Sequence, residues 1–342
     1  MTTAPAAVPD LRGAVHAVAE RAAALDAGST DVRADIAALG QRGLLALGVD
    51  RMAQVIAAVS EASLAAGFSA WAQRMAIEYL QLAPPSLRDR HLPDLRAGIR
   101  VGVTAMAAGL RQVAGLGAVP LTAERADGGL SISGPIRWAS NVFPDALIVL
   151  PARAADGQTY VAAVPADAPG VTINPSPPLM ALTGTASTSL TLHRVRVHPD
   201  DLISTDLTGF VHRIRPTFLL LQTAFCLGIG GAALDAAQAT SAGIDRHFRA
   251  EAQRLRTAHR ALGEQVSAAA RAPLRAALPE LIRLRLDAAT TAVNATRLES
   301  TLCGGAGYVL GSAANRRFRE AAFLPVQSPS EGQLRWELEQ YE

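Results

Sequence analysis

The sequence predicts an α+β protein in three parts: a helical N-terminal domain (1–100), an antiparallel β-barrel middle domain (101–203) and a C-terminal helical bundle of the four-helix type (204–342). Apolar residues recur at the helical period in the first and last parts, which predicts amphipathic helices. In the middle part, short apolar runs are separated by glycine- and proline-containing turns, a pattern typical of an antiparallel barrel or sandwich. No helix alternates with these strands, which argues against a Rossmann sheet.

The helical period predicts the N-terminal elements in order. A capped helix is expected between Asp31 and Gly40, followed by helices over 54–66, 69–82 and 89–98. The expected strands of the middle part are 101–104, 119–124, 129–134, 146–152, 160–164, 171–174 and 187–197.

The C-terminal part contains long apolar-periodic stretches that predict an antiparallel bundle. Helices are expected over 206–241, 245–272, 279–302 and 312–323, with a final helix after a short polar loop. The longest apolar run, Phe218 to Leu234, contains polar residues and three glycines, so we expect a buried bundle helix and not a membrane span.

Composition excludes several classes of function. The 342 residues carry a net charge of +2, which gives no reason to expect nucleic acid or a membrane as a partner. All 32 basic side chains are arginine, which excludes Schiff-base chemistry and a P-loop, because both need lysine. The seven histidines show no metal-ligand spacing. The two cysteines, in apolar surroundings, and the lack of a signal-peptide pattern predict a reduced, cytoplasmic protein.

Three C-terminal motifs carry a family resemblance. The glycine turn 303–308, the arginine-rich helix 315–321 and the polar loop 327–335 resemble the C-terminal end of the acyl-CoA dehydrogenase flavoenzymes. The order of the three parts is similar to that family along nearly the whole chain, although the N-terminal unit and the second bundle helix are shortened. In the family the polar loop carries the glutamate that removes a substrate α-proton, and the matching position here is Ser328.

Replacement of the glutamate casts doubt on the family's usual reaction, because a serine hydroxyl cannot act as a general base unaided. Glu331, one helical turn further on, is a candidate base if it turns inward; the alternative is a carboxylate favoured at a helix N-terminus. Ser330 falls where the family has a cofactor-contacting threonine. Arg319 in the preceding helix is expected to form a structural ion pair and not to bind a ligand.

The same resemblance implies flavin contacts. The segment 136–141 matches the family element in which a tryptophan packs on the flavin and a hydroxyl lies near its reactive nitrogen, which points to Trp138 and Ser140. Thr104 matches a threonine at the flavin's pyrimidine edge, with a plain strand end as the alternative. Gly304 and Gly305 match a turn that approaches a neighbouring subunit's dinucleotide, with a helix C-cap as the alternative.

The resemblance therefore implies a cytoplasmic flavoprotein oxidoreductase that uses FAD, or alternatively FMN, on an acyl thioester such as acyl-CoA or on a related small molecule. It also implies a homodimer or homotetramer formed through the bundle. Two alternatives stay open. One is a reduced-flavin-dependent monooxygenase of the same fold, and the other is a degenerate member that binds acyl groups or a partner without redox chemistry.

Overall fold

The computed structural model describes residues 10–240 and 243–341, and the N-terminal part of this range is helical. Its helices are α1 (Leu11–Asp26), α2 (Arg33–Gln41), α3 (Val49–Ala62), α4 (Leu64–Gln81) and α5 (Pro85–Arg96). Ser63 caps α4, because its side chain accepts a hydrogen bond from the backbone N–H of Ala66. Almost every residue of α4 is buried, which makes this helix the core of the N-terminal part.

The strands between residues 102 and 204 form one sheet. They are β1 (Gly102–Thr104), β2 (Thr122–Ala126), β3 (Gly129–Ala139), β4 (Leu147–Arg153), β5 (Thr159–Pro165), β6 (Val171–Ile173), β7 (Thr188–Val197) and β8 (Leu202–Ser204). Their order is β6-β7-β3-β2-β4-β5-β8, with β1 beside β4. Neighbouring strands pair antiparallel except for the parallel pairs β1–β4 and β2–β4.

The sheet has the mainly antiparallel pairing that the sequence predicted, but among the described residues it is open and does not close into the expected barrel. The path ends at β6 and β8, which have three residues each and do not pair with one another. Strands this short blunt the edges of an open sheet without closing it. The strands otherwise overlap the predicted ranges, and β8 was not predicted.

The segment after β1 forms a short helix, α6 (Ala107–Val113), which the sequence did not predict. Leu110 of this helix is buried. A Cβ at Gly109 would come within 3.3 Å of side-chain atoms of Leu207 and Pro151, so glycine lets α6 lie close to the sheet and to the start of the bundle.

The C-terminal part is a bundle of long helices, as predicted. It contains α7 (Leu207–Thr240), α8 (Arg249–Ala270), α9 (Leu278–Cys303), α10 (Ala313–Ala321) and α11 (Glu331–Glu339). The predicted end of the first helix, Ser241, lies outside the described residues. The helix α7 is long and apolar enough to cross a membrane, but 83% of its most apolar window is buried against other helices of the protein, as expected for a bundle core.

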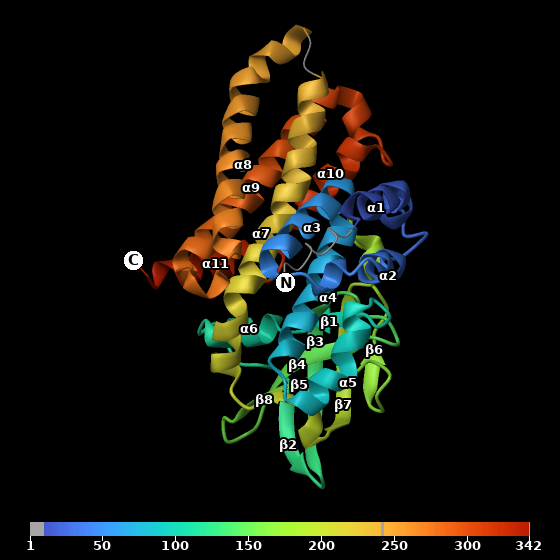
Figure 1. Cartoon of the computed structure of the whole chain (residues 1–342), viewed down its shortest axis with the longest axis vertical. Coiled ribbons are helices and arrows are strands. Elements are labelled where there is room, and N and C mark those ends of the chain that lie inside the picture. Colours follow the sequence, from blue (N-terminus) through green and yellow to red (C-terminus); the bar gives the residue numbers. More distant parts are fainter. Residues whose placement is uncertain (1–9, 241–242, 342) are drawn as a thin grey trace, which may run out of the picture.

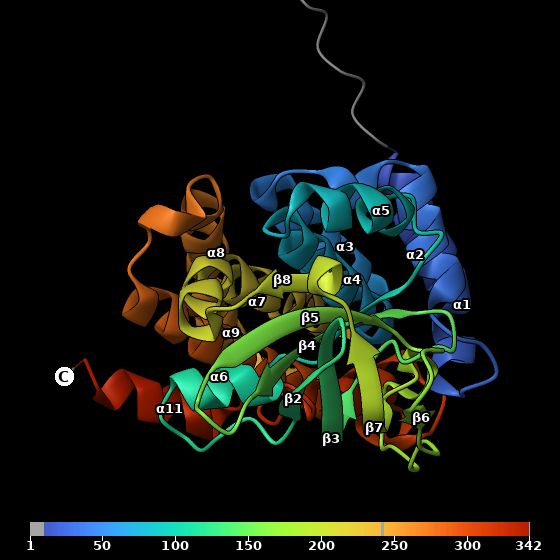
Figure 2. The same cartoon turned by 90° about the horizontal axis from the view of Figure 1, so that it is seen from below.

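The sheet lies at one end of the long axis and the upper bundle at the other (Figure 1). Figure 2 shows the N-terminal helices along one side of the sheet, and α4 contacts both β1 and β4. The element type changes between α5 and β1 and again between β8 and α7, near the predicted boundaries. The division into three separate domains stays a prediction.

Candidate functional site

Helix α4 joins the two chain segments that carry the predicted site residues. The Nδ2 atom of Asn141, next to Ser140, donates to the carbonyl of Ser69 over 3.1 Å. The ring of Phe68 lies 5.0 Å from that of Phe323, at the start of the C-terminal loop. Because Phe68 and Ser69 are adjacent, the end of β3 and the loop that leads to Ser328 meet at the same turn of α4.

Trp138 lies on β3 at a break in the β3–β7 register between Ile136 and Ala139. Such a bulge redirects the side chains of the affected strand. The indole of Trp138 is 58% exposed, so the structural alternative of a core tryptophan does not apply. A large flat apolar ring is thus open for contact at the end of the strand.

Ser140 belongs to a chain of hydroxyl groups. Its Oγ lies 2.6 Å from Oγ of Ser187, which lies 2.7 Å from Oγ1 of Thr185. Thr185 in turn donates to the carbonyl of Leu182 over 2.8 Å. Thr185 is fully buried, whereas Ser140 and Ser187 are half-buried, so the chain leads from the interior toward the surface near Trp138.

Thr104 ends β1, and its hydroxyl lies 2.9 Å from the hydroxyl of the fully buried Tyr79. Tyr79 is ten residues beyond Ser69 on α4, which corresponds to about 15 Å along the helix axis. Thr104 and the end of β3 therefore contact the same helix, α4, at points about 15 Å apart along its axis.

The loop that carries Ser328 is held by its backbone. The side chains of Gln222 and Gln327 both donate to the carbonyl of Ser328, over 2.9 and 2.7 Å. Arg285 of α9, 1% exposed, donates to the carbonyl of Leu324 and to Oε1 of Gln327 over 3.0 and 3.2 Å. The hydrogen bonds that hold Ser328 in this loop are thus made by its carbonyl oxygen and not by its hydroxyl.

Glu331 does not turn inward. Its carboxylate pairs with Arg335 at 2.7 Å, one turn further along the exposed side of α11. This pairing satisfies the charge on the helix surface and favours the alternative of a carboxylate at a helix N-terminus, whereas Glu331 as a base stays a prediction. Ser330 is the N-cap of α11 and accepts from the backbone N–H of Gln333.

Three further carboxylates, on α10, α4 and α1, are engaged in contacts of their own. Glu320 of α10 accepts from the backbone N–H groups of Leu64 and Ala65 at the start of α4, and burial raises its pKa to about 7. Glu78 pairs with Arg74 at 2.6 Å on α4. Arg319 pairs with Asp26, as the sequence predicted.

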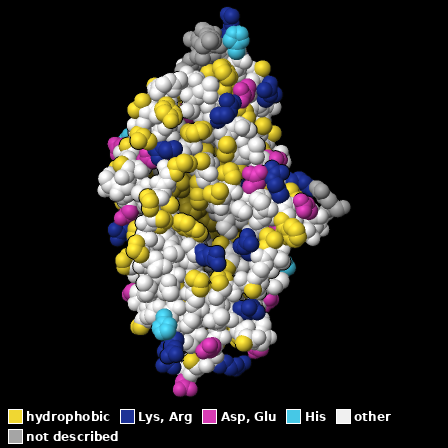
Figure 3. All heavy atoms as spheres, turned by 180° about the vertical axis from the view of Figure 1, so that it is seen from behind, with side chains coloured by type: hydrophobic (Ala, Val, Ile, Leu, Met, Phe, Trp, Pro, Cys, Tyr) yellow, Lys and Arg dark blue, Asp and Glu magenta, His cyan; other side chains and the backbone are white. Residues whose placement is uncertain are grey.

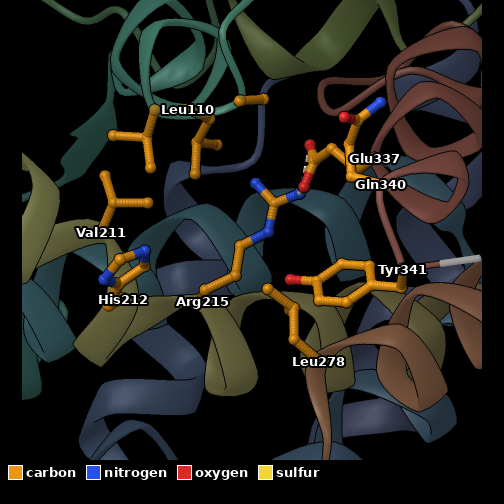
Figure 4. Close-up of a pocket in the computed structure, with 10 residues that line it drawn as sticks. Leu110, Val211, His212, Arg215, Leu278, Glu337, Gln340 and Tyr341 are labelled. Carbon is orange, nitrogen blue, oxygen red and sulfur yellow. Dashed lines mark hydrogen bonds and ion pairs between the residues drawn. The ribbon is translucent and has the colours of Figure 1, made fainter.

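A cleft of about 190 Å³ lies between α6, α7 and α11 (Figure 4). Its polar centre is an ion pair in which Arg215 donates to Glu337 over 2.6 Å. Burial lowers the pKa of Arg215, against the opposing effect of Glu337. The Tyr341 hydroxyl points toward Arg215, and most of the other lining residues are apolar. The remaining lining residues are Leu110, Val113, Ala114, Val211, His212, Leu278 and Gln340.

The cleft is lined by helices that follow two of the predicted site residues, Thr104 and Ser330. Helix α6 begins three residues after Thr104, and α11 begins directly after Ser330. The sequence carries one signal for this cleft, namely an arginine directly before Pro216, at the start of the long apolar stretch of α7. Arg285 was similarly detectable, because it lies at an apolar position of the α9 period.

The glycine turn after α9 is exposed. Gly304 has a φ of +57°, and a Cβ at Gly304 or Gly305 would meet nothing within 4 Å. The next residues Tyr308, Val309 and Leu310 are exposed, Tyr308 by 86%. Gly304 follows the last residue of α9, so the C-cap interpretation holds, and the open backbone leaves room for the predicted approach of another molecule.

Figure 3 shows the face opposite to that of Figure 1, which is hollowed near its middle and lined there by hydrophobic side chains. The exposed large apolar side chains of the described residues include Trp138, Met180, Phe318 and Val326. Met180 lies beside α10, because its carbonyl accepts from Arg319. An exposed indole with a neighbouring hydroxyl fits one side of a flat heteroaromatic ring, so the residues present fit the ring part of a flavin.

No protein-family model matches the sequence, and no curated protein sequence matches it. Solved structures do match over nearly the whole length of both chains. Butyryl-CoA dehydrogenase from Megasphaera elsdenii has a TM-score of 0.87 at 14% identity, covering 99% of each chain. Glutaryl-CoA dehydrogenase from Mycobacterium smegmatis in complex with FADH2 has a TM-score of 0.82 at 14% identity, covering 98% of this chain and 95% of the other.

Dibenzothiophene monooxygenase from Paenibacillus sp. A11-2 is also similar, with a TM-score of 0.77 at 19% identity, covering 97% of this chain and 95% of the other. The chain therefore has the fold of the acyl-CoA dehydrogenases and related flavoenzymes, as the sequence predicted. This fold includes dehydrogenases and monooxygenases, so the choice between them rests on the residues of this chain.

Proposed function

We propose that this protein is a flavin-dependent oxidoreductase that acts on a small molecule. The observation that carries the proposal is the indole of Trp138, exposed at a bulge two residues before the hydroxyl of Ser140. Trp138 would hold the ring, Ser140 would face its reactive edge, and Thr104, Gly304, Gly305 and Ser330 are the further candidate contacts. When bound, FAD, or FMN as the alternative, would exchange a hydride or electrons with the substrate.

We assign the substrate to the cleft between α6, α7 and α11, since α6 begins three residues after Thr104 and α11 begins directly after Ser330. Its apolar walls and single buried ion pair suit a small, mostly apolar molecule with one or two polar groups. A volume of about 190 Å³ is below the usual range of about 300–1,000 Å³ for ligand pockets, so a CoA moiety would extend outside it.

The absence of a carboxylate at position 328 bears on the choice between dehydrogenation and monooxygenation. Glu331 pairs with Arg335, and Glu320 caps α4, so these carboxylates are not available at the loop for removing an α-proton. This observation supports the second candidate, a monooxygenase that takes up reduced flavin and oxygen. A positioned base contributes about 10²- to 10⁴-fold to the rate, so we expect slow or absent dehydrogenation of saturated acyl-CoA thioesters.

The test begins with the absorption spectrum of the purified protein and mass spectrometry of any released cofactor. Anaerobic mixing with a panel of acyl-CoAs then follows the flavin absorbance. No bleaching in the native protein, together with bleaching in Ser328→Glu, supports the assignment of the base position. Bleaching of the native protein at about 1 to 10³ per second would show that another residue is the base. A protein that binds neither oxidised nor reduced flavin would favour the degenerate, non-redox alternative.

We also propose a homodimer or homotetramer in the cytoplasm. The exposed apolar run 308–310 directly follows the open glycine turn, and exposed apolar patches are typical of protein interfaces. Light scattering at micromolar concentration checks this, and a monomer would contradict it. Changing Leu310 to Asp should shift the mass toward the monomer without loss of helical signal in circular dichroism.

A further inference from the structure

The direction of the hydrogen bonds in the hydroxyl chain is fixed at its buried end. A carbonyl oxygen can only accept, so in the 2.8 Å contact Thr185 donates its single hydroxyl proton to Leu182. The 2.7 Å contact between Thr185 and Ser187 is then a hydrogen bond only if Ser187 donates. Thr185 is fully buried, so bulk water cannot supply a different donor at this point.

The same count of hydroxyl protons determines whether Ser140 donates or accepts. Since the proton of Ser187 is used on Thr185, the 2.6 Å contact between Ser140 and Ser187 requires Ser140 to donate. If Ser187 instead donated to Ser140, the hydroxyl oxygens of Ser187 and Thr185 would be in contact at 2.7 Å with no proton between them. In its hydrogen-bonded arrangement, Ser140 therefore offers only lone pairs to a ligand that approaches from the side of Trp138.

An acceptor at this position distinguishes between the two redox states of a flavin. The N5 atom of an oxidised flavin is an acceptor, whereas N5 of the fully reduced flavin carries a proton and donates. We propose that Ser187 and Thr185 are positioning residues that hold Ser140 as an acceptor and so make the protein select reduced over oxidised flavin. This inference rests on the proposed function, because it takes Ser140 to face the reactive edge.

The neighbouring polar groups do not reset this arrangement. The Nδ2 atom of Asn141 is directed at the carbonyls of Ser69 and Gly102, on the side of α4. Its backbone N–H donates to the carbonyl of Thr185 over 2.8 Å, which ties the end of β3 to the segment before β7. The hydroxyl chain is therefore held at fixed spacing by backbone contacts that do not involve its protons.

The experiment measures the affinity of the purified protein for FAD and FMN in both redox states, by anaerobic fluorescence and absorbance titration with and without dithionite. The reduced form should bind about 5- to 100-fold more tightly, the range for one hydrogen bond gained against one unpaired acceptor. The reduction potential of the bound flavin should accordingly lie above that of the free flavin.

Two variants test the relay independently. In Ser187→Ala, Ser140 loses its acceptor and can donate its proton to the ligand. In Thr185→Val, Ser187 loses its acceptor and can donate to Ser140, which again frees the Ser140 proton. Both variants should therefore lower the ratio of the two affinities toward one. Ser189→Ala is the matched control, because this serine lies on the same strand but accepts from Asn174, and its ratio should stay at the native value. Circular dichroism confirms that each variant folds.

The outcomes separate the two proposals. Equal affinity of the native protein for oxidised and reduced flavin would overturn the inference while leaving the proposed function in place. A native preference that survives in both folded relay variants would overturn the role of Ser187 and Thr185. If neither redox form binds to the native protein at all, the proposed function fails, and the inference fails with it.

Discussion

The two sides of the candidate site differ in what holds them in place. At the end of β3, Ser140 is hydrogen-bonded through its side-chain hydroxyl, and the Trp138 indole is exposed. At the C-terminal loop, the contacts of Ser328 and Leu324 run through their backbone carbonyls to Gln222, Gln327 and Arg285. A loop held by its backbone tolerates a change of side chain, so the residue at the position of Ser328 can change while the loop geometry persists.

The largest expected effect comes from breaking the frame of this loop. Changing Arg285 to Met leaves the carbonyl of Leu324 and Oε1 of Gln327 without this buried donor. Each such group costs about 1–3 kcal/mol, so we expect the free energy of unfolding to fall by about 2–6 kcal/mol. Urea denaturation measures it. Arg283→Met, at an exposed position of the same helix, is the control, and an equal loss in both variants would contradict the role of Arg285.

The second effect is a pH dependence. Burial raises the pKa of Glu320 from 4.5 to about 7, so the folded protein binds this proton more tightly than the unfolded chain. The contribution of Glu320 to stability is therefore largest below about pH 4.5 and decreases as the pH rises to about 7, by roughly 3 kcal/mol. Urea denaturation of the native protein and of Glu320→Gln at pH 5 and pH 8 measures the difference. Parallel stability curves would contradict the prediction.

The third effect is expected at Trp138, on the β3 side of the site. Trp138→Ala removes an aromatic face and should weaken flavin binding by about 1–3 kcal/mol, which corresponds to roughly 5- to 150-fold in the dissociation constant. Trp336→Ala is the control, because it removes another partly exposed indole, which lies on α11 and donates to the carbonyl of Ala114. Flavin fluorescence measures both, and an affinity unchanged by Trp138→Ala would remove it from the site.

The smallest effect on stability is expected at Ser328 itself. Ser328→Ala keeps the backbone carbonyl that accepts from Gln222 and Gln327, so its unfolding free energy should stay within about 0.5 kcal/mol of the native value. Gln222→Leu removes one of the two donors and should cost more. If Ser328→Ala proved the more destabilising of the two, the loop would depend on the hydroxyl, and the backbone account of its frame would be wrong.

The sequence was sufficient for elements whose signal is local. The helical period located α4, α7 and α9, and the turn residues located most strands. It was insufficient where the deciding contact is distant: Glu331 was free to turn inward until its pairing with Arg335 was known, and the open sheet depends on how β6 and β8 end. Arg285 acts on groups 39 and 42 residues away, and the hydroxyl partner of Ser140 lies 47 residues away.

The hydrogen bonds between Glu320 and the start of α4 also order events during synthesis. The backbone N–H of Leu64 lies 256 residues before its acceptor in the chain. At about 5–20 residues per second, a ribosome needs about 13 to 50 seconds to cover that distance. The N–H groups at the start of α4 therefore find their native acceptor, Glu320, only near the end of translation. A chain released before that point would leave this end of α4, the helix that supports both sides of the site, without its hydrogen-bond partner.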